Sequence, residues 1–186
     1  KSQLPSDRSL SLSFPIKPEK EAEGLAVVAT DDAMRKALDE TLRRGLVRSR
    51  YRLLVDASLG PQISMTEETG HLPGAGSDGP EFTLYSGPTS CPASPEIHTA
   101  LYLVNARPST KAARELRRSF AAAGAPVMFD ASYHPRYGSK SVDEKNSFSS
   151  SLPGTLTMQL CELEMPDPFR PKEMIKITAP IPKDGC

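Results

Sequence analysis

The sequence lacks several features that would identify a class of protein at once. It has no tryptophan, only three cysteines, and no net charge, because 23 Lys and Arg balance 23 Asp and Glu. An odd, sparse set of cysteines is not a disulfide framework, so we expect reduced thiols. No apolar run reaches the 18 residues of a membrane helix, so no membrane span is expected. Overall neutrality excludes a strongly basic nucleic-acid coat protein as a description of the whole chain.

The chain is rich in residues that interrupt regular structure. It contains 12 Gly and 18 Pro among 186 residues. This composition predicts an extended arm over 1–24 and a long loop over 56–80. Residues 139–153 form a Ser-rich loop, and 180–186 form a C-terminal tail. One α+β domain is expected over 25–179, because the length suits a single ordinary domain.

Periodic patterns predict the regular elements of that domain. Residues 31–44 and 109–123 have the apolar spacing of helices. Asp31 and Asp32 suit the positive end of the first helix dipole, and Ser109 suits the N-cap of the second helix. Strands are expected at 46–55, 81–86, 97–105, 126–130, 156–165 and 173–179, with a short strand-like stretch at 9–14 and a Pro-rich connector at 87–95. A slip in alternation near Leu160–Cys161 predicts a β-bulge.

These elements give the predicted fold class. We expect an α+β fold with a mixed sheet of five or six strands and two helices. The order strand, helix, strand over 97–130 predicts one βαβ unit.

Charge is strongly segregated along the chain. Residues 33–52 hold seven basic and two acidic residues, residues 53–106 hold six acids and no Lys or Arg, and residues 107–118 hold five basic residues and one acid. The two basic segments either neutralise the acidic one within the fold or form a basic face for an acidic partner.

Candidate binding residues come from these basic segments and from one unusual turn. Alternation places Arg48, Arg50 and Arg52 on one face of a strand. The second helix carries further basic residues off its buried stripe. The turn at 133–137 combines two tyrosines, a histidine and an arginine, which suits either base stacking or a packed turn. The candidate RNA-binding or acidic-partner-binding residues are Arg48, Arg50, Arg52, Lys111, Arg114, Arg117, Arg118, Tyr133, Arg136 and Tyr137.

Other motifs fail the structural context that their chemistry needs. The G-x-G-x-x-G match at 74–79 is followed by Pro80 and a strand, whereas a dinucleotide site needs a helix there. Cys91-Pro-Ala-Ser94 also lacks the following helix that lowers a reactive thiol's pKa. The histidines and cysteines are too far apart in sequence for metal-ligand spacing. No metal and no cofactor is therefore expected, and no catalytic residue is assigned.

The leading functional prediction is a non-catalytic structural or accessory subunit of a large multi-subunit assembly, bound to other protein subunits through its arms and basic face. One alternative is an RNA-binding protein of the ribosomal type. Another is a small thiol-dependent or hydrolytic enzyme around Cys91, with His98 and Asp130. Because the chain begins at Lys1, either a presequence has been removed or the chain is truncated. An intracellular location follows, with a mitochondrial or other organellar one fitting a removed presequence.

Overall fold

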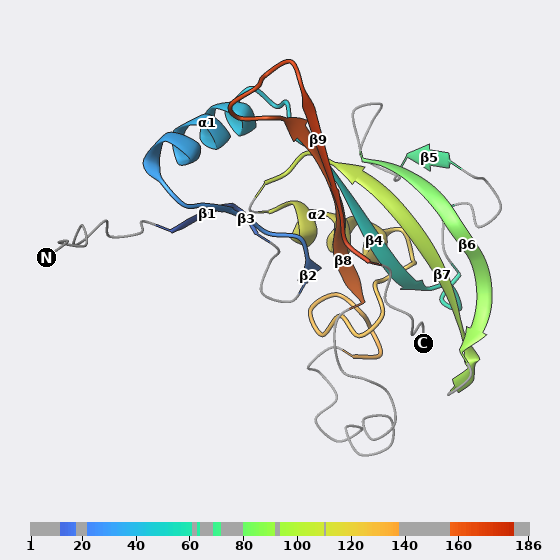
Figure 1. The fold of residues 1–186 in the computed structure, drawn as a ribbon. Coiled ribbons are helices and arrows are strands. Elements are labelled where there is room, and N and C mark those ends of the chain that lie inside the picture. The colour runs from blue at the N-terminus through green and yellow to red at the C-terminus, as the bar shows by residue number, and fades with distance from the viewer. Residues whose placement is uncertain are drawn as a thin grey trace, which may run out of the picture.

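A computed structural model describes residues 12–17, 22–60, 63, 69–71, 80–91, 94–109, 111–137 and 157–180. The elements in chain order are β1 Ser13–Ile16, β2 Glu23–Gly24, β3 Val27–Ala29, α1 Asp32–Arg43, β4 Arg48–Asp56, β5 Thr69–His71, β6 Glu81–Cys91, β7 Ser94–Ala106, α2 Ala112–Ala122, β8 Met158–Pro166 and β9 Met174–Thr178. The predicted α+β class with two helices and a mixed sheet is confirmed for this part of the chain (Figure 1).

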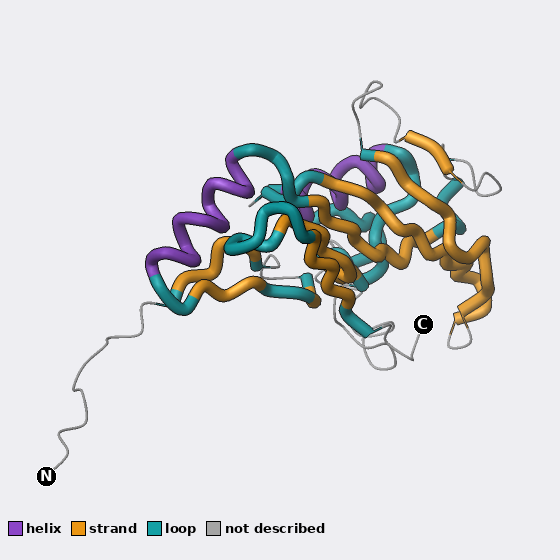
Figure 2. Tube along the Cα trace, turned by 45° about the horizontal axis from the view of Figure 1, so that its top comes forward, coloured by secondary structure: helices purple, strands orange, loops and turns teal. Residues whose placement is uncertain are grey.

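Within the described residues the main sheet has seven strands, where five or six were expected. Its order is β2-β8-β4-β7-β6-β5, with β9 also paired to β8. The β2–β8 pair is parallel and the other pairs are antiparallel. A separate two-stranded sheet joins β1 to β3, and α1 lies alongside it (Figure 2). The central strands β4, β7 and β8 therefore form the scaffold on which the rest of the chain is arranged.

The core lies between α2 and one face of this sheet. Phe120 of α2 packs against Tyr102 of β7 with ring centroids 5.4 Å apart and the rings tilted by 58°, and Phe82 of β6 meets Tyr102 edge-on at the same distance. Tyr102, Phe120 and Leu53 of β4 are all fully buried. Since α2 covers this face, the opposite face of β4 carries the alternate side chains, including the three arginines of the predicted row.

Local signals placed the helix ends well at α1 and less well at α2. The Asp31 carboxylate accepts a hydrogen bond from the Met34 amide at 2.8 Å, as an N-cap does. Gly45 has a φ of 68°, the left-handed conformation that ends the helix. At α2 the cap residue is Lys111 and makes no side-chain cap bond. The Ser109 hydroxyl, two residues before this cap, accepts a hydrogen bond from the Lys111 amide.

The β-bulge predicted in the C-terminal strand is present. Arg50 pairs with Glu162 and Tyr51 pairs with Leu160, so Cys161 is the extra residue of β8. The bulge lets apolar side chains face the core on both sides of the slip, since Leu160 and Leu163 are both buried.

Besides β2 and β3, which were not expected, three segments differ from the sequence prediction. The 87–95 connector is part of a long β6–β7 hairpin, because the shift in register between Ser86 and Thr89 accommodates Pro88, which has no amide to donate. The strand expected at 126–130 is reduced to one bridge between Val55 and Val127, so the βαβ unit has only this bridge as its second strand. The expected 56–80 loop contains the short β5.

Several predicted segments lie wholly or mostly outside the described residues. They are most of the 1–24 arm, most of the 56–80 loop, the Ser-rich loop over 139–153 and the tail beyond 180. The predicted domain boundaries stay predictions.

Candidate nucleic-acid interface

A groove of about 1010 Å³ lies where β4 begins, β7 ends and α2 starts, and it extends to β8. Its lining mixes both signs of charge. The charged residues are Arg48, Arg50, Arg107, Glu81, Glu115, Glu162 and Glu164. Such a volume is at the upper end of the roughly 300–1,000 Å³ usual for ligand pockets. The groove is therefore large enough to hold a ligand rather than a single ion.

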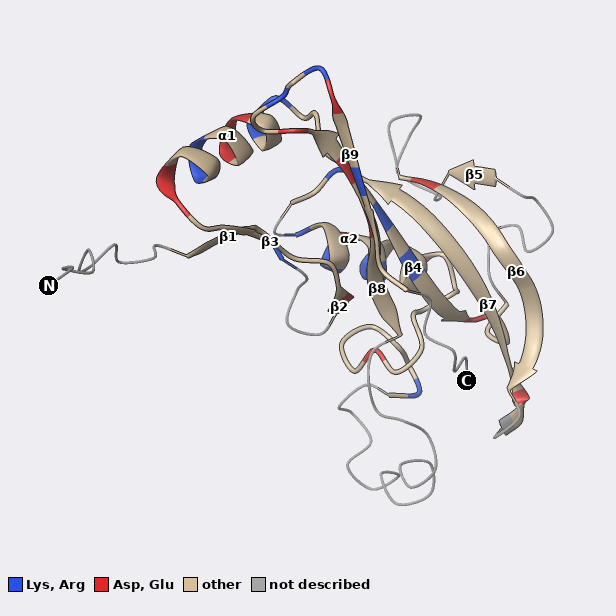
Figure 3. Ribbon diagram, viewed as in Figure 1, with Lys and Arg blue, Asp and Glu red and all other residues tan. Residues whose placement is uncertain are grey.

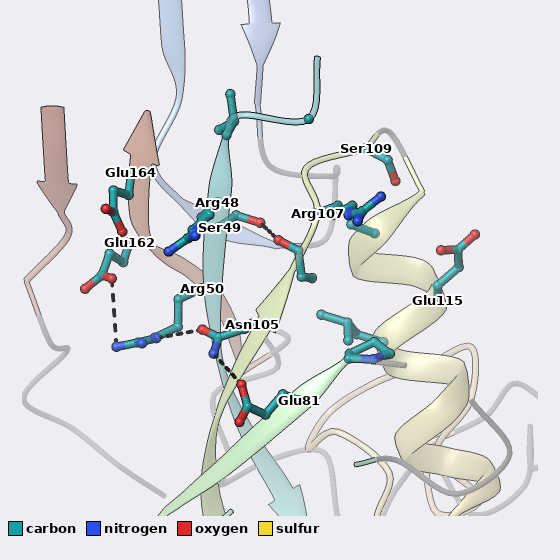
Figure 4. A pocket seen from close by; sticks show the side chains of 16 residues that line it. Arg48, Ser49, Arg50, Glu81, Asn105, Arg107, Ser109, Glu115, Glu162 and Glu164 are labelled. Atoms are coloured by element: carbon teal, nitrogen blue, oxygen red, sulfur yellow. Dashed lines mark hydrogen bonds and ion pairs between the residues drawn. The ribbon is translucent and has the colours of Figure 1, made fainter. Parts of the chain in front are cut away.

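A hydrogen-bonded network runs along one wall of the groove (Figure 4). Arg50 Nε donates to Asn105 Oδ1 at 3.0 Å, and Asn105 Nδ2 donates to Glu81 Oε2 at 3.3 Å. Arg50 Nη1 also lies 3.8 Å from Glu162 Oε1. Four strands, β4, β6, β7 and β8, contribute to this network, so the orientation of the Arg50 guanidinium is fixed by the sheet.

The register confirms that the three β4 arginines share one face, but their environments differ. Arg48 is exposed and pairs in register with Glu164 of β8. Arg50 faces Glu162, which Lys176 of β9 also contacts at 3.0 Å. Arg52 lies opposite a neutral residue, Gln159, and its Nη1 is buried without a hydrogen-bond partner in the described part of the chain.

The acidic partners of this row were missed by sequence reasoning. Glu162 and Glu164 alternate with buried residues along β8. The two-residue period of the strand therefore already indicated that both glutamates lie on the face away from the core. Nothing in the local sequence shows that β8 pairs with β4. The β4 row is therefore part of a mixed-charge surface instead of a continuous basic face (Figure 3).

The basic residues of α2 separate into an exposed stripe and one buried member. Lys111, Arg114 and Arg118 are exposed and follow the three- and four-residue spacing of one helix face. Arg117 was predicted with them, but its side chain is 6% exposed and lies 3.3 Å from Asp130, which is wholly buried. The helix phase turns Arg117 toward the segment that follows α2, so it does not belong to the basic face.

The segment over 133–137 is a packed turn with one partly exposed arginine. The His134 ring is buried and lies 4.3 Å from the ring of Tyr137. Tyr133 lies under the Arg117 guanidinium at 5.4 Å, and Tyr137 also contacts Phe129. Tyr133 and Tyr137 are thus held in the packing of this turn, and Arg136 reaches the surface with 34% of its side chain exposed.

Arg136 and His134 both converge on a buried carboxylate that the sequence gave no reason to choose. Asp56, at the end of β4, has Oδ2 at 3.3 Å from His134 Nε2 and from Arg136 Nη1. Its Oδ1 accepts from the amide and hydroxyl of Ser58. Burial alone would raise the pKa of Asp56, but the contacts with His134, Ser58 and Arg136 outweigh it and lower that pKa.

The protonation state of His134 follows from its neighbours. The Arg136 amide donates to His134 Nδ1 at 3.1 Å, so Nδ1 carries no proton. Nε2 then carries the proton and faces Asp56. This cluster fixes the 131–137 turn against β4, at the opposite end of the strand from the groove.

The alternative of an enzyme around Cys91 is not supported by the geometry. Cys91 is 1% exposed and disulfide-bonded, so it offers no thiol nucleophile, and the expectation of reduced thiols was wrong there. The free cysteine among the described residues is Cys161, and burial raises its pKa. The exposed His98 lies next to Ser90, while Asp130 is held by Arg117.

Two further findings concern metals and membranes. The described residues contain no cluster of His, Cys, Asp or Glu that would hold a metal ion. In the same part of the chain, no helix is both long and apolar enough to cross a membrane.

Comparison with known proteins finds similarity in structure alone. No protein-family model matches the sequence, and no curated protein matches it. The fold is similar to that of human RNA pseudouridylate synthase domain containing 1, with a TM-score of 0.63 and 16% identity, over 94% of this chain and 71% of that one. It is also similar to human RNA pseudouridylate synthase domain containing 4, with a TM-score of 0.59 and 15% identity, over 92% of this chain and 72% of that one.

These similarities correct the leading functional prediction. A non-catalytic structural subunit was predicted from the arms and the loop-rich composition, whereas the fold is one found in proteins named for RNA pseudouridylate synthase domains. The similarity covers 94% and 92% of this chain. The comparison therefore shows a fold similar to that of two proteins named for RNA pseudouridylate synthase domains.

Proposed function

We propose that this protein binds RNA and is an RNA-modifying enzyme domain with the pseudouridylate synthase fold. The observation that carries the proposal is the match of the fold over 94% of the chain to a protein named for that domain. Because a fold does not by itself fix an activity, the proposal also needs a site suited to RNA. The groove and the α2 stripe supply one.

The α2 stripe suits the RNA backbone. Lys111, Arg114 and Arg118 are exposed beside the groove, and Arg107 extends the same charge to its rim. Basic side chains hold phosphates without reading sequence, and this charge supplies much of the affinity of RNA-binding proteins. The groove next to the stripe then receives the part of the RNA that is recognised.

The experiment that tests RNA binding is fluorescence anisotropy of a labelled single-stranded RNA. The logarithm of the binding constant should fall linearly with the logarithm of salt concentration, because phosphate contacts release counterions. Each phosphate contact contributes a slope of about 0.7 for a single strand. An affinity that is absent, or that does not change between about 50 and 200 mM salt, contradicts the proposal.

A second measurement separates binding from modification. A uridine-containing transcript is incubated with the protein, digested to nucleosides and analysed for pseudouridine by chromatography and mass spectrometry. Heat-denatured protein is the control. An amount of pseudouridine above that control would support the proposed enzymatic activity. If the protein binds the RNA and no pseudouridine forms, the function is RNA binding without modification.

A further inference from the structure

The turn between β8 and β9 extends beyond the neighbouring strands of the main sheet. Arg48, the first residue of β4, pairs in register with Glu164 of β8, so the last residues of β8 have β9 as their partner strand. The hairpin overhangs the start of β4 and carries the turn over 167–173 at its end (Figure 1). Arg48 and Glu164 both line the groove. The turn therefore lies beyond one edge of the candidate interface.

Hydrogen bonds restrain the backbone of this turn. Asp167 Oδ1 accepts from the amides of Phe169 and Arg170, at 2.8 and 3.1 Å. The Asp167 amide donates to the Glu173 carbonyl at 2.9 Å, and the Glu173 amide donates to the Arg170 carbonyl at 2.8 Å. Two prolines within the turn fix two further φ angles. A side chain on this turn therefore binds a ligand with little loss of backbone freedom.

The turn presents an aromatic side chain to solvent. Phe169 is 62% exposed, the largest exposed fraction among the large apolar side chains of the described residues. It belongs to neither of the two hydrophobic core clusters. The ring therefore contributes little to the stability of the fold by burial. An exposed ring on a restrained turn is a surface on which a planar ligand can stack.

Two cations lie within three residues of this ring. Lys172 is exposed and makes no ion pair within the described residues. Arg170 lies 3.4 Å from Glu173, but the two side chains are 70% and 61% exposed. A pair exposed to this degree is weak enough for a phosphate to replace the carboxylate. Proteins that bind single-stranded nucleic acid combine the same two features, basic groups for phosphates and aromatic rings for bases.

We propose that Phe169 stacks on an unpaired base of single-stranded RNA, with Arg170 and Lys172 contacting the adjoining phosphates. This step rests on the proposed function and names the class of RNA that the domain binds. Stacking needs the open face of a base, which neighbouring pairs cover in a duplex. The ligand is therefore a single strand, a loop or an end. Because every base has a π-face, the contact tolerates any base.

The surroundings of Phe169 favour RNA over a protein partner. A hot spot in a protein interface lies among neighbours that exclude water around it. Four of the seven residues in the turn are charged. A protein partner would have to remove these charges from water, whereas an RNA strand contacts the two cations with its phosphates.

The test removes the ring and measures RNA affinity by fluorescence anisotropy. Phe169→Ala in the full chain should weaken binding of a labelled oligouridylate about 5- to 150-fold, the range for one stacked base. The loss for an oligoadenylate should lie in the same range, because stacking does not read the base. Phe169→Tyr keeps an aromatic ring and should bind as the unchanged protein does. Phe169→Leu keeps an apolar side chain without a ring and should lose most of the affinity.

Three controls separate stacking from other effects. Phe14→Ala is the matched variant, because Phe14 is 53% exposed on β1 in the separate two-stranded sheet, and it should keep the full affinity. An abasic oligomer of equal length has phosphates and no bases, so Phe169→Ala should bind it as tightly as the unchanged protein does. Lys172→Ala should reduce the salt slope by about 0.7, which Phe169→Ala should leave unchanged.

The outcomes separate this inference from the function on which it rests. If the unchanged protein binds no oligomer, both are overturned. If Phe169→Ala binds as the unchanged protein does, with the expected salt dependence, the stacking contact is overturned and RNA binding stays intact. The same result with a change from dimer to monomer in sedimentation would make the turn a contact between two copies of the chain. An equal loss on the abasic oligomer, or in Phe14→Ala, also overturns stacking at this turn.

Discussion

The arginine row of β4 and the basic stripe of α2 are equivalent in sequence and different in the folded protein. Both have clustered positive charge on one face of an element. On β4, Arg50 faces Glu162, which also contacts Lys176. On α2, Lys111 and Arg118 are exposed and make no ion pair within the described residues.

This difference shows that a charge pattern along one element does not define a charged surface. A strand in a sheet has two neighbours whose side chains share its face, so their charges are always part of the same surface. A helix packed on a sheet by one side presents its opposite side to solvent alone. The helix stripe is therefore the better candidate for phosphate contacts, and four experiments sharpen the comparison.

The largest effect is expected at the one arginine of α2 that is buried. Arg117→Met leaves Asp130 as an uncompensated buried charge, which should lower the free energy of unfolding by about 3–5 kcal/mol. Urea denaturation measures it. Adding Asp130→Asn should recover most of the loss, whereas Arg118→Ala, one position further along, should change stability by less than about 0.5 kcal/mol. An Arg117→Met variant as stable as the unchanged protein would mean that the pair is not formed.

The next largest effect on stability is expected at Asp56, the buried carboxylate at the end of β4. Glu162, by contrast, is a partly exposed carboxylate. Asp56→Asn should lower stability by about 1–3 kcal/mol at pH 7, since His134 and Arg136 lose the charged carboxylate that they face.

This contribution depends on pH in a defined direction. The folded pKa of Asp56 is lowered, so its stabilisation is present above the ordinary pKa of about 3.9 and is lost as the pH falls through the lower, folded value. The gap between the unchanged protein and Asp56→Asn should therefore close in acid. Thermal unfolding from pH 7 down to pH 3 measures it, and a gap that widens in acid would contradict the assignment.

A smaller effect is expected when the charge of the α2 stripe is reversed. Lys111→Glu with Arg118→Glu should weaken RNA binding roughly tenfold and reduce the salt slope by about 1.4, because two phosphate contacts are lost. Both residues are exposed, so the midpoint temperature of thermal unfolding should stay unchanged. Arg35→Glu with Lys36→Glu on α1 is the control with the same change in charge, and an equal loss there would mean that net charge alone drives binding.

The smallest effect tests the neutralised row of β4. Glu162→Gln removes the carboxylate that Arg50 and Lys176 share, which should raise RNA affinity by about 0.2–1 kcal/mol, at most about fivefold. The same anisotropy titration measures it. A gain larger than the loss from reversing the α2 stripe would make the β4 row the main RNA contact.

Much of the secondary structure was predictable because it depends on local periodicity. The helix over 31–44, the central strands and the bulge at Cys161 follow from apolar spacing and from a slip in alternation. The β6–β7 hairpin was shortened in prediction because Pro88 was read as a break, and the register shift that tolerates it depends on the partner strand. Arg117 was misplaced because helix phase alone cannot reveal that Asp130 folds back on that side.

The candidate site was predicted only in part, because contacts between distant segments leave no local pattern in the sequence. Arg48, Arg50, Lys111, Arg114 and Arg118 were selected from their charge and period. Glu81, Asn105 and Glu162, which orient Arg50, come from three other strands. The Asp56 cluster joins residues 78 and 80 positions apart, and no sequence pattern marks such a contact.

The sequence by itself determined the elements of this protein and the face of each element that carries charge, because both depend on the 3.6- and 2-residue periods of the backbone. The tertiary structure alone decided which charges are neutralised, which arginine is buried and where a groove opens. It decided these because Coulomb energy and burial depend on distances between side chains, and folding brings together residues that are far apart in the chain.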